Sequence, residues 1–298
     1  MSNHQPKILV TGAAGHLGSL VVAELVRSLG YPVEQIIAAS RNPDQLVEWA
    51  KLGVETRKAD FTDVAGLAEA FRGVDRLLLI STDSPVNELR LGQHLHAVEA
   101  AKLAGVQSIV YTSMPKAEDS AVSFASVHLG TENAIKASGL TYTILRNGWY
   151  FENLAVTIPG AVSSGTLYSA AGDGGISYLS RQDLAKAAAA ALVAGSEFEN
   201  ETLTLTGETA LSYPAIAAKV SEAVGKPISV VQVPVGAIIE GAKSHGLPEV
   251  VATMIASFDA ATAAGDLSVV TSDYERLTGK KPTPFGVWLE ANKQLFTA

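Results

Sequence analysis

Three glycines near the start of the chain are the residues whose spacing points most directly to chemistry. They lie in residues 11–18, which read TGAAGHLG and connect an apolar run to an amphipathic helical pattern. Gly12 permits a tight turn, Gly15 lets the backbone approach a pyrophosphate, and Gly18 lets the helix pack against its strand. The free amides and positive dipole of such a helix end attract phosphate groups. This G-x-x-G-x-x-G spacing, placed between strand and helix, favours a dinucleotide-binding loop over simple turn chemistry.

The residue after the second predicted strand indicates which dinucleotide is bound. That strand ends at Ser40 and is followed by Arg41 and Asn42. A site for NAD usually has an acidic residue there, which accepts hydrogen bonds from the ribose hydroxyls. Arg41 could instead bind a 2′-phosphate through two parallel hydrogen bonds, so NADP(H) is predicted in preference to NAD(H). The alternative is that Arg41 is a surface residue at the start of a helix.

Residues after the later strands complete the predicted cofactor site. Asp60 would accept a hydrogen bond from the adenine amine, while Ser81 and Thr82 would line the path towards the nicotinamide. His16 is expected to face solvent beside the phosphates and not to act as a base. The cofactor-binding residues predicted in this half of the chain are Gly12, Ala13, Ala14, Gly15, His16, Leu17, Arg41, Asp60, Phe61, Ser81, Thr82 and Thr112.

The elements that must position these residues follow an alternating pattern. Strands are predicted at residues 7–11, 36–40, 54–58, 76–80, 108–113 and 141–146, with helical patterns between them. Each predicted strand is nearly all apolar, as expected when helices cover both faces of a sheet. The pattern therefore predicts an α/β protein built on a doubly wound parallel-sheet Rossmann domain.

After residue 146 the alternation loosens. Strands are predicted at residues 166–169, 201–205 and 228–232, and helices at 181–193, 214–224, 235–245 and 249–264. No flexible linker is visible, so a smaller C-terminal α/β lobe packed on the cofactor cleft is expected. The predicted division is an NADP(H)-binding domain at residues 1–153 and a substrate lobe at 154–298, with the first sheet able to recruit the segment near 181–206.

The composition of the 298-residue chain argues against several classes of function. A net charge of −8 without a Lys/Arg cluster disfavours nucleic acid as a partner. The absence of cysteine excludes disulfides and thiolate chemistry and fits a reducing cytoplasm. No targeting signal is expected at the N-terminus, and the longest apolar stretch, residues 187–194, is far shorter than the roughly 20 residues of a membrane span. No metal site is expected either, because His94 and His96 fall on different faces of a helical pattern.

Several segments together resemble the NmrA-like branch of the atypical short-chain dehydrogenases, and within it the bacterial NAD(P)H:quinone oxidoreductase 2 group that includes triphenylmethane reductase. The likeness runs nearly end to end, and it is most specific in residues 145–153, LRNGWYFEN. It is carried by residues 11–18, 40–43 (SRNP), 59–61 (ADF), 78–81 (LLIS), 111–113 (YTS) and 145–153. The resemblance implies direct hydride transfer from NADPH, without flavin, to a quinone or another conjugated acceptor. It also places at the nicotinamide end of the cleft Asn147, Gly148, Trp149, Tyr150, Phe151 and Glu152.

The chain departs from ordinary short-chain dehydrogenases at their Tyr-x-x-x-Lys motif, where a lysine lowers the tyrosine pKa for proton transfer. In its place the chain has His128 and Glu132, one helical turn apart, as in the quinone oxidoreductase group. His128 is predicted to contact nicotinamide or donate a proton, and otherwise to be a structural helix histidine. Glu132 is predicted either to orient His128 or to be a solvated helix carboxylate. The predicted catalytic residues are His128, Glu132 and Tyr150.

Aromatic residues are expected to wall the acceptor pocket. Either Trp149 or Tyr150 is expected there, whereas Tyr111 is expected to belong to the core and Tyr178 only to approach the cleft. The apolar candidates, between pocket and core, are Met114, Phe124, Trp149, Phe151, Met254 and Phe258.

The sequence thus predicts an NADPH-dependent reductase of quinones or similar conjugated small molecules. The alternatives are an NADP(H)-binding redox sensor without turnover, and a reductase of a triphenylmethane dye, enone or ketone. The protein is expected to be cytoplasmic and to be a monomer or a homodimer.

Overall fold

The computed structural model describes residues 5–297 and contains two compact units. Unit 1 comprises residues 5–113, 127–146 and 181–203, and unit 2 comprises residues 114–126, 147–180 and 204–297. The chain therefore passes between the units several times. The first four residues, on which the expectation about targeting partly rests, lie outside the described part.

The central sheet has seven strands in the order β3-β2-β1-β4-β5-β6-β9. The registered pairs from β3 to β6 are all parallel. The order reverses between β1 and β4, which is where open α/β sheets bind ligands beyond the strand ends. The strands are β1 Ile8–Val10, β2 Ile36–Ser40, β3 Glu55–Lys58, β4 Arg76–Leu79, β5 Ser108–Ser113, β6 Thr141–Asn147 and β9 Glu201–Leu205. This confirms the predicted doubly wound α/β fold.

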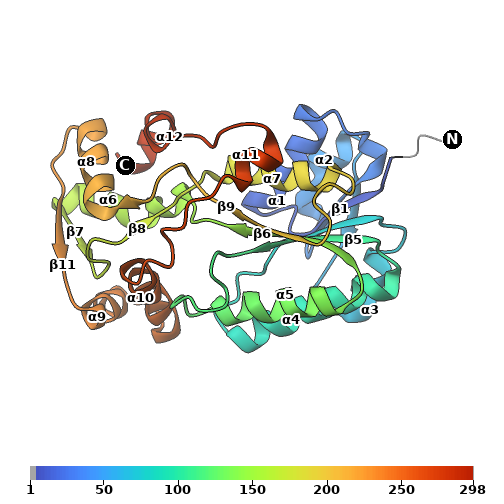
Figure 1. The fold of residues 1–298 in the computed structure, drawn as a ribbon, viewed down its shortest axis with the longest axis horizontal. Coiled ribbons are helices and arrows are strands. Elements are labelled where there is room, and N and C mark those ends of the chain that lie inside the picture. Colours follow the sequence, from blue (N-terminus) through green and yellow to red (C-terminus); the bar gives the residue numbers. More distant parts are fainter. Residues whose placement is uncertain (1–4, 298) are drawn as a thin grey trace. The chain divides into compact units, whose positions relative to one another are not determined.

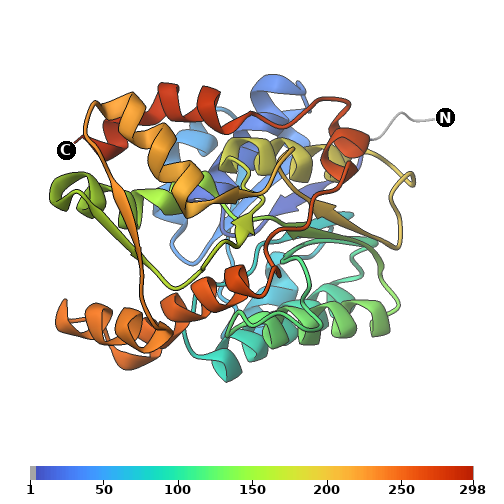
Figure 2. The same ribbon diagram turned by 60° about the vertical axis from the view of Figure 1, so that its left-hand side comes forward.

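Helices cover both faces of this sheet (Figures 1 and 2). One face carries α1 and α7, which pack against each other, and the other carries α3, α4 and α5. Strands β1, β2 and β4 are accordingly almost fully buried. The helices are α1 His16–Ala23, α2 Val47–Lys51, α3 Val64–Ala70, α4 Asn87–Ala104, α5 Ala125–Ala137 and α7 Arg181–Val193.

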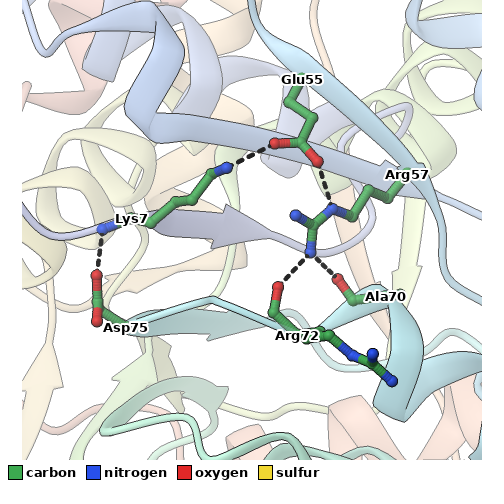
Figure 3. Close-up of polar contacts among 6 residues, drawn as sticks. All are labelled: Lys7, Glu55, Arg57, Ala70, Arg72 and Asp75. Atoms are coloured by element: carbon green, nitrogen blue, oxygen red, sulfur yellow. Dashed lines mark hydrogen bonds and ion pairs between the residues drawn. The ribbon is translucent and has the colours of Figure 1, made fainter.

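Strand β3 differs from the prediction that every strand is apolar. It reads Glu-Thr-Arg-Lys and none of its residues is fully buried, because it forms the edge of the sheet. Charged residues on an edge strand discourage pairing with a strand of another molecule. Figure 3 shows how this edge is held: Lys7 and Arg57 both contact the Glu55 carboxylate, at 2.8 and 2.6 Å.

Unit 2 has two small sheets. Strand β7 pairs with β11 in parallel, and β8 pairs with β10 in antiparallel fashion. The helices α9 and α10 lie side by side. Its elements are α6 Leu154–Ser164, β7 Thr166–Ser169, β8 Gly175–Ile176, β10 Leu211–Ser212, α8 Tyr213–Val224, β11 Ser229–Gln232, α9 Val235–Ser244, α10 Glu249–Ala263, α11 Asp273–Thr278 and α12 Phe285–Asn292.

Three helices of unit 2 were not predicted. Pro159 lies inside α6, and proline normally argues against a helix interior. Helices α11 and α12 have six and eight residues, which is too short for a clear helical period. No helix among the described residues has the length and apolar character needed to cross a membrane.

Candidate active site

The phosphate loop connects β1 to α1 and has the backbone form that the glycines predict. Gly12 has a φ of +61°, and its carbonyl accepts a 2.8 Å hydrogen bond from the Gly15 amide. A Cβ on Gly18 would lie 2.3 Å from the Gly12 oxygen, so only glycine fits there. Ala13 fixes the loop to β2, since its amide donates to the Ala39 carbonyl at 2.9 Å.

The start of α1 is open for an anion. Gly15 occupies the N-cap position and provides no side-chain hydrogen bond to the first amides of the helix. Gly12, Gly15 and His16 are exposed, so the loop backbone is accessible. Uncapped amides at a helix N-terminus bind phosphate favourably. The loop therefore fits the pyrophosphate of a dinucleotide.

The adenine side of the candidate site has the two charged residues that were predicted. Arg41 follows β2 directly and is exposed. Asp60 follows β3, and its Oδ1 accepts hydrogen bonds from the Thr62 amide (3.0 Å) and the Thr62 hydroxyl (2.8 Å). These bonds lower the pKa of Asp60, with Lys58 and Arg41 adding to the effect. Phe61 is buried in the core of unit 1, so only its backbone borders this region.

Thr11 and Thr112 hold the ends of β1, β4 and β5 together. The Thr11 hydroxyl donates to the Leu78 carbonyl at 2.9 Å and accepts from the Ile80 amide at 3.0 Å. The Thr112 hydroxyl accepts from the Ser81 amide at 2.9 Å. Thr112 is buried, whereas Ser81 remains partly exposed. Thr112 thus fixes the predicted cofactor-lining segment after β4.

Two histidines of α4 contact the backbone of segments that were predicted to line the cofactor, a role that sequence reasoning missed. The His94 Nε2 accepts from the Thr82 amide at 2.9 Å, and its Nδ1 contacts the Thr131 hydroxyl at 2.9 Å. The Thr131 hydroxyl donates to the Val127 carbonyl at 2.8 Å, so it accepts from Nδ1 of a neutral His94. The His96 Nδ1 lies 3.0 Å from the Phe61 carbonyl. His94 and His96 lie on different faces of α4, which argued against a metal site. The same spacing lets His94 contact the segment at Thr82 and His96 the segment at Phe61.

His128 lies in a buried polar cluster of unit 1. Its Nδ1 is 2.8 Å from the Tyr111 hydroxyl, and its Nε2 is 3.3 Å from an Arg90 nitrogen. Because guanidinium can only donate, Nε2 accepts and the ring is neutral with its proton on Nδ1. Burial and the nearby Arg90 charge hold the pKa of His128 well below its ordinary value. Both features disfavour the predicted proton donation by His128.

Glu132 is neither solvated nor hydrogen-bonded to His128, contrary to both expectations for it. It is fully buried and forms a two-pronged pair with Arg146, at 2.9 and 2.7 Å. Its Oε1 also accepts from the Ser113 hydroxyl at 2.6 Å, and Lys136 lies 3.5 Å from Oε2. Burial in a low-dielectric interior requires such partners for a carboxylate. Glu132 therefore ties α5 to the ends of β5 and β6.

Asn147, the last residue of β6, carries an unsatisfied polar atom. It is 5% exposed, and its Oδ1 is buried without a hydrogen-bond partner among the described residues. Such atoms are rare in native interiors, and a ligand that donates a hydrogen bond would remove the cost. The amide group of a nicotinamide is one such donor. Gly148, the next residue, is required by packing instead, since a Cβ there would lie 2.7 Å from the Ser177 carbonyl.

The aromatic candidates in unit 2 separate into two groups. Phe124, Trp149 and Phe258 form a half-buried cluster, in which the Trp149 and Phe258 ring centroids are 4.8 Å apart. Phe151 is buried against Phe285, Trp288 and Tyr178. Phe151 and Tyr178 therefore fill the core of this unit, and the first cluster offers the accessible flat surface. Tyr150 and Glu152 are both partly exposed.

Tyr178 also belongs to a polar group with Tyr213 and Asp259, whose side chains act on one another electrostatically. Burial raises the pKa of Tyr178 and of Tyr213, and burial also raises the pKa of Asp259. Asp259 accepts a 2.6 Å hydrogen bond from the Ala170 amide, so these groups connect the segments that follow β7 and β8 with α8 and α10.

Comparison with known proteins places these features in one family. The model of the NmrA-like family matches residues 4–289. Quinone oxidoreductase 2 of Escherichia coli K12 is 37% identical over 276 residues, which cover 93% of this chain and 95% of the relative. The NAD(P)H azoreductase of Xenophilus azovorans is 27% identical and covers 98% of this chain and 99% of its own.

Solved structures agree with this assignment. The structure of the E. coli NADPH-dependent quinone oxidoreductase with NADPH has a TM-score of 0.90 and 36% identity, covering 95% of this chain and 99% of that chain. Citrobacter triphenylmethane reductase has a TM-score of 0.88 and 34% identity, covering 98% and 100%. The resemblance seen in the sequence is thus confirmed, and the chain belongs to the NmrA-like family.

Proposed function

We propose that this protein is an NADPH-dependent oxidoreductase that reduces a quinone or a similar conjugated small molecule by direct hydride transfer without flavin. The observation that carries most weight is the open, uncapped glycine loop in a chain 37% identical to a quinone oxidoreductase along almost its whole length. Related azo-dye and triphenylmethane reductases support a flat, conjugated acceptor.

The residues present fit NADP(H). The phosphate loop would hold the pyrophosphate, Arg41 the 2′-phosphate, and the amide of Asn147 the nicotinamide. When bound, NADPH supplies a hydride, and one further proton completes the two-electron reduction of a quinone to a hydroquinone. The half-buried cluster of Phe124, Trp149 and Phe258 would stack on the acceptor, because aromatic faces bind flat conjugated rings.

In this proposal the extra proton comes from water. His128 is held neutral, and its two nitrogens are bound by Tyr111 and Arg90. A quinone or cationic dye tolerates this, since its π system disperses the charge that the hydride brings. His128 and Glu132 then act as positioning residues, and Tyr150 remains the proposed contact to the acceptor.

The test is NADPH oxidation without added flavin, followed by absorbance, against benzoquinones, naphthoquinones, triphenylmethane dyes, azo dyes and activated ketones. We expect decay with at least one quinone or dye and a higher kcat/KM with NADPH than with NADH. Tight NADPH binding without decay on any acceptor would refute the enzyme and favour a redox sensor. Size-exclusion chromatography of the same preparation would distinguish a monomer from a homodimer. We propose that the protein is located in the cytoplasm in either oligomeric state.

A further inference from the structure

The cations near the ends of β2 and β3 differ in whether they have partners. Arg57 pairs with Glu55 at 2.6 Å and also donates to the carbonyls of Ala70 and Arg72, as Figure 3 shows. Arg72 pairs with Glu69 at 2.5 Å, and Lys51 with Glu48 at 2.6 Å. In residues 5–297, Arg41 and Lys58 form no ion pair with any carboxylate. These two positive charges therefore remain available to a ligand.

The sheet register brings Lys58 to Arg41. Lys58 is the last residue of β3 and is in register with Ser40, the last residue of β2. The Ala59 amide donates to the Ser40 carbonyl at 3.0 Å, so the two strand ends are firmly joined. Arg41 is the next residue after Ser40, and both cationic side chains are exposed. Neighbouring parallel strands lie about 5 Å apart, which long side chains easily span.

Both positive charges act on the carboxylate of Asp60, the second residue after β3. Lys58 and Arg41 both lower the pKa of Asp60. Lys58 and Asp60 also line a hollow of about 530 Å³ beside β3. The other carboxylates that line this hollow are Asp63, whose Oδ1 caps α3, Glu55, which pairs with Arg57, and Glu69, which pairs with Arg72. A doubly charged phosphate would compete well with the single charge of Asp60 for both cations.

We propose that Lys58 is a second ligand of the 2′-phosphate of NADP(H) and acts with Arg41 to set the preference for NADP(H) over NAD(H). This inference rests on the proposed cofactor. The planar guanidinium of Arg41 would give two directed hydrogen bonds, while the ammonium of Lys58 would add a point charge from the neighbouring strand. NADH lacks the phosphate, so Lys58 contributes nothing to its binding.

The test compares four proteins: wild type, Lys58→Gln, Arg41→Gln and the double variant. Binding of NADPH and of NADH is measured by fluorescence titration, with 2′-AMP and 5′-AMP as competitors. We expect Lys58→Gln to weaken NADPH binding by about 5- to 20-fold, as for a partly exposed charge-assisted contact, and to leave NADH binding unchanged. Raising the salt concentration should weaken NADPH binding less in Lys58→Gln than in wild type, because a charge contact has been lost.

Lys51→Gln is the matched control, since Lys51 is exposed in the same unit and already paired with Glu48. It should change neither affinity. Equal losses for NADPH and NADH in Lys58→Gln, or no loss for NADPH, would overturn the role of Lys58. If Arg41→Gln removes the preference for NADPH while Lys58→Gln leaves it unchanged, only the inference about Lys58 is wrong. If wild type binds neither dinucleotide, the proposed function itself is wrong.

Discussion

The phosphate loop and the polar residues of α5 form a contrast within unit 1. In the loop, backbone amides at the start of α1 are open and have no side-chain cap. On α5, His128 and Glu132 are buried, and their polar atoms are bound by Tyr111, Arg90 and Arg146. Backbone amides without a hydrogen-bond partner in the protein can bind a ligand. Side chains whose polar atoms already have partners stabilise the surrounding structure instead. The contrast separates residues expected to contact the cofactor from residues that position strand ends.

The largest effect that would test this contrast is expected for Glu132→Gln. The variant removes a fully buried carboxylate that pairs with Arg146 and accepts from the Ser113 hydroxyl, which should reduce the free energy of unfolding by about 3 kcal/mol. Chemical denaturation measures this loss. If Glu132 only positions the strand ends, kcat per folded molecule should fall less than 10-fold, because the variant leaves every proposed cofactor contact in place.

A matched control is Glu99→Gln, which breaks the exposed 3.3 Å pair with Lys102. Its stability should change by less than about 0.5 kcal/mol. A Glu132→Gln variant of normal stability but with kcat reduced more than 100-fold would show instead that Glu132 takes part in catalysis, and the contrast would fail.

The sequence predicted the backbone form of the glycine loop better than the partners of the buried α5 residues, for a physical reason. The glycine loop is a local feature: turn, close approach and helix packing all follow from eight consecutive residues. The partners of the α5 residues come from elsewhere in the chain, such as Arg90 for His128 and Arg146 for Glu132. A helical spacing of four suggested that His128 and Glu132 would meet, but nothing in the spacing reveals what the rest of the fold offers each of them.

The same distinction applies to the fold. The alternating pattern predicted most strands of the central sheet to within a residue at each end. Strand β3 was placed correctly, but the statement that the strands are nearly all apolar overlooked its residues Glu-Thr-Arg-Lys, whose charges are typical of an edge strand. The role of His94 was also missed: its partners, Thr82 and Thr131, lie 12 and 37 residues away along the chain.

The pH dependence of stability offers a second, smaller test. Burial, first, and the Arg90 charge lower the pKa of His94 to about 3, and the pKa of His128 is lowered in the same direction. The unfolded chain takes up protons at these histidines below their ordinary pKa of about 6.5, whereas the folded chain does not. Stability is therefore full above that pH and falls as the pH decreases towards 3.

At pH 5 His94 should cost about 2 kcal/mol relative to pH 7, and His128 should lower the stability further in the same direction. Urea denaturation across this range measures the loss, and replacing His128 with Asn should make the pH dependence shallower. The exposed His245 is the control, because His245→Gln should leave the slope unchanged. A steeper loss of stability towards high pH would mean that His128 is charged in the fold, which would restore it as a proton donor.

Replacing Asn147 is expected to have the smallest effect on stability of the changes considered. It should also separate an effect on activity from an effect on stability most clearly. Its Oδ1 is buried without a hydrogen-bond partner among the described residues, so the side chain costs the folded protein free energy when no ligand is present. Asn147→Leu removes this polar atom and keeps the branched shape of the side chain. Thermal unfolding without cofactor should be unchanged or shifted slightly upwards, while NADPH-dependent turnover should fall by about 10-fold or more through loss of the nicotinamide contact.

Substituting most other buried polar residues should have the opposite result. The protein would lose stability, and activity would fall only because less of the protein is folded. Thr143 is the matched control: it is buried on the same strand, and its hydroxyl donates to the Phe198 carbonyl at 2.9 Å. Thr143→Val should lower the melting temperature and leave KM for NADPH unchanged. If Asn147→Leu instead behaves like Thr143→Val, then Asn147 belongs with the satisfied scaffold of α5, and the nicotinamide amide must be bound by another residue.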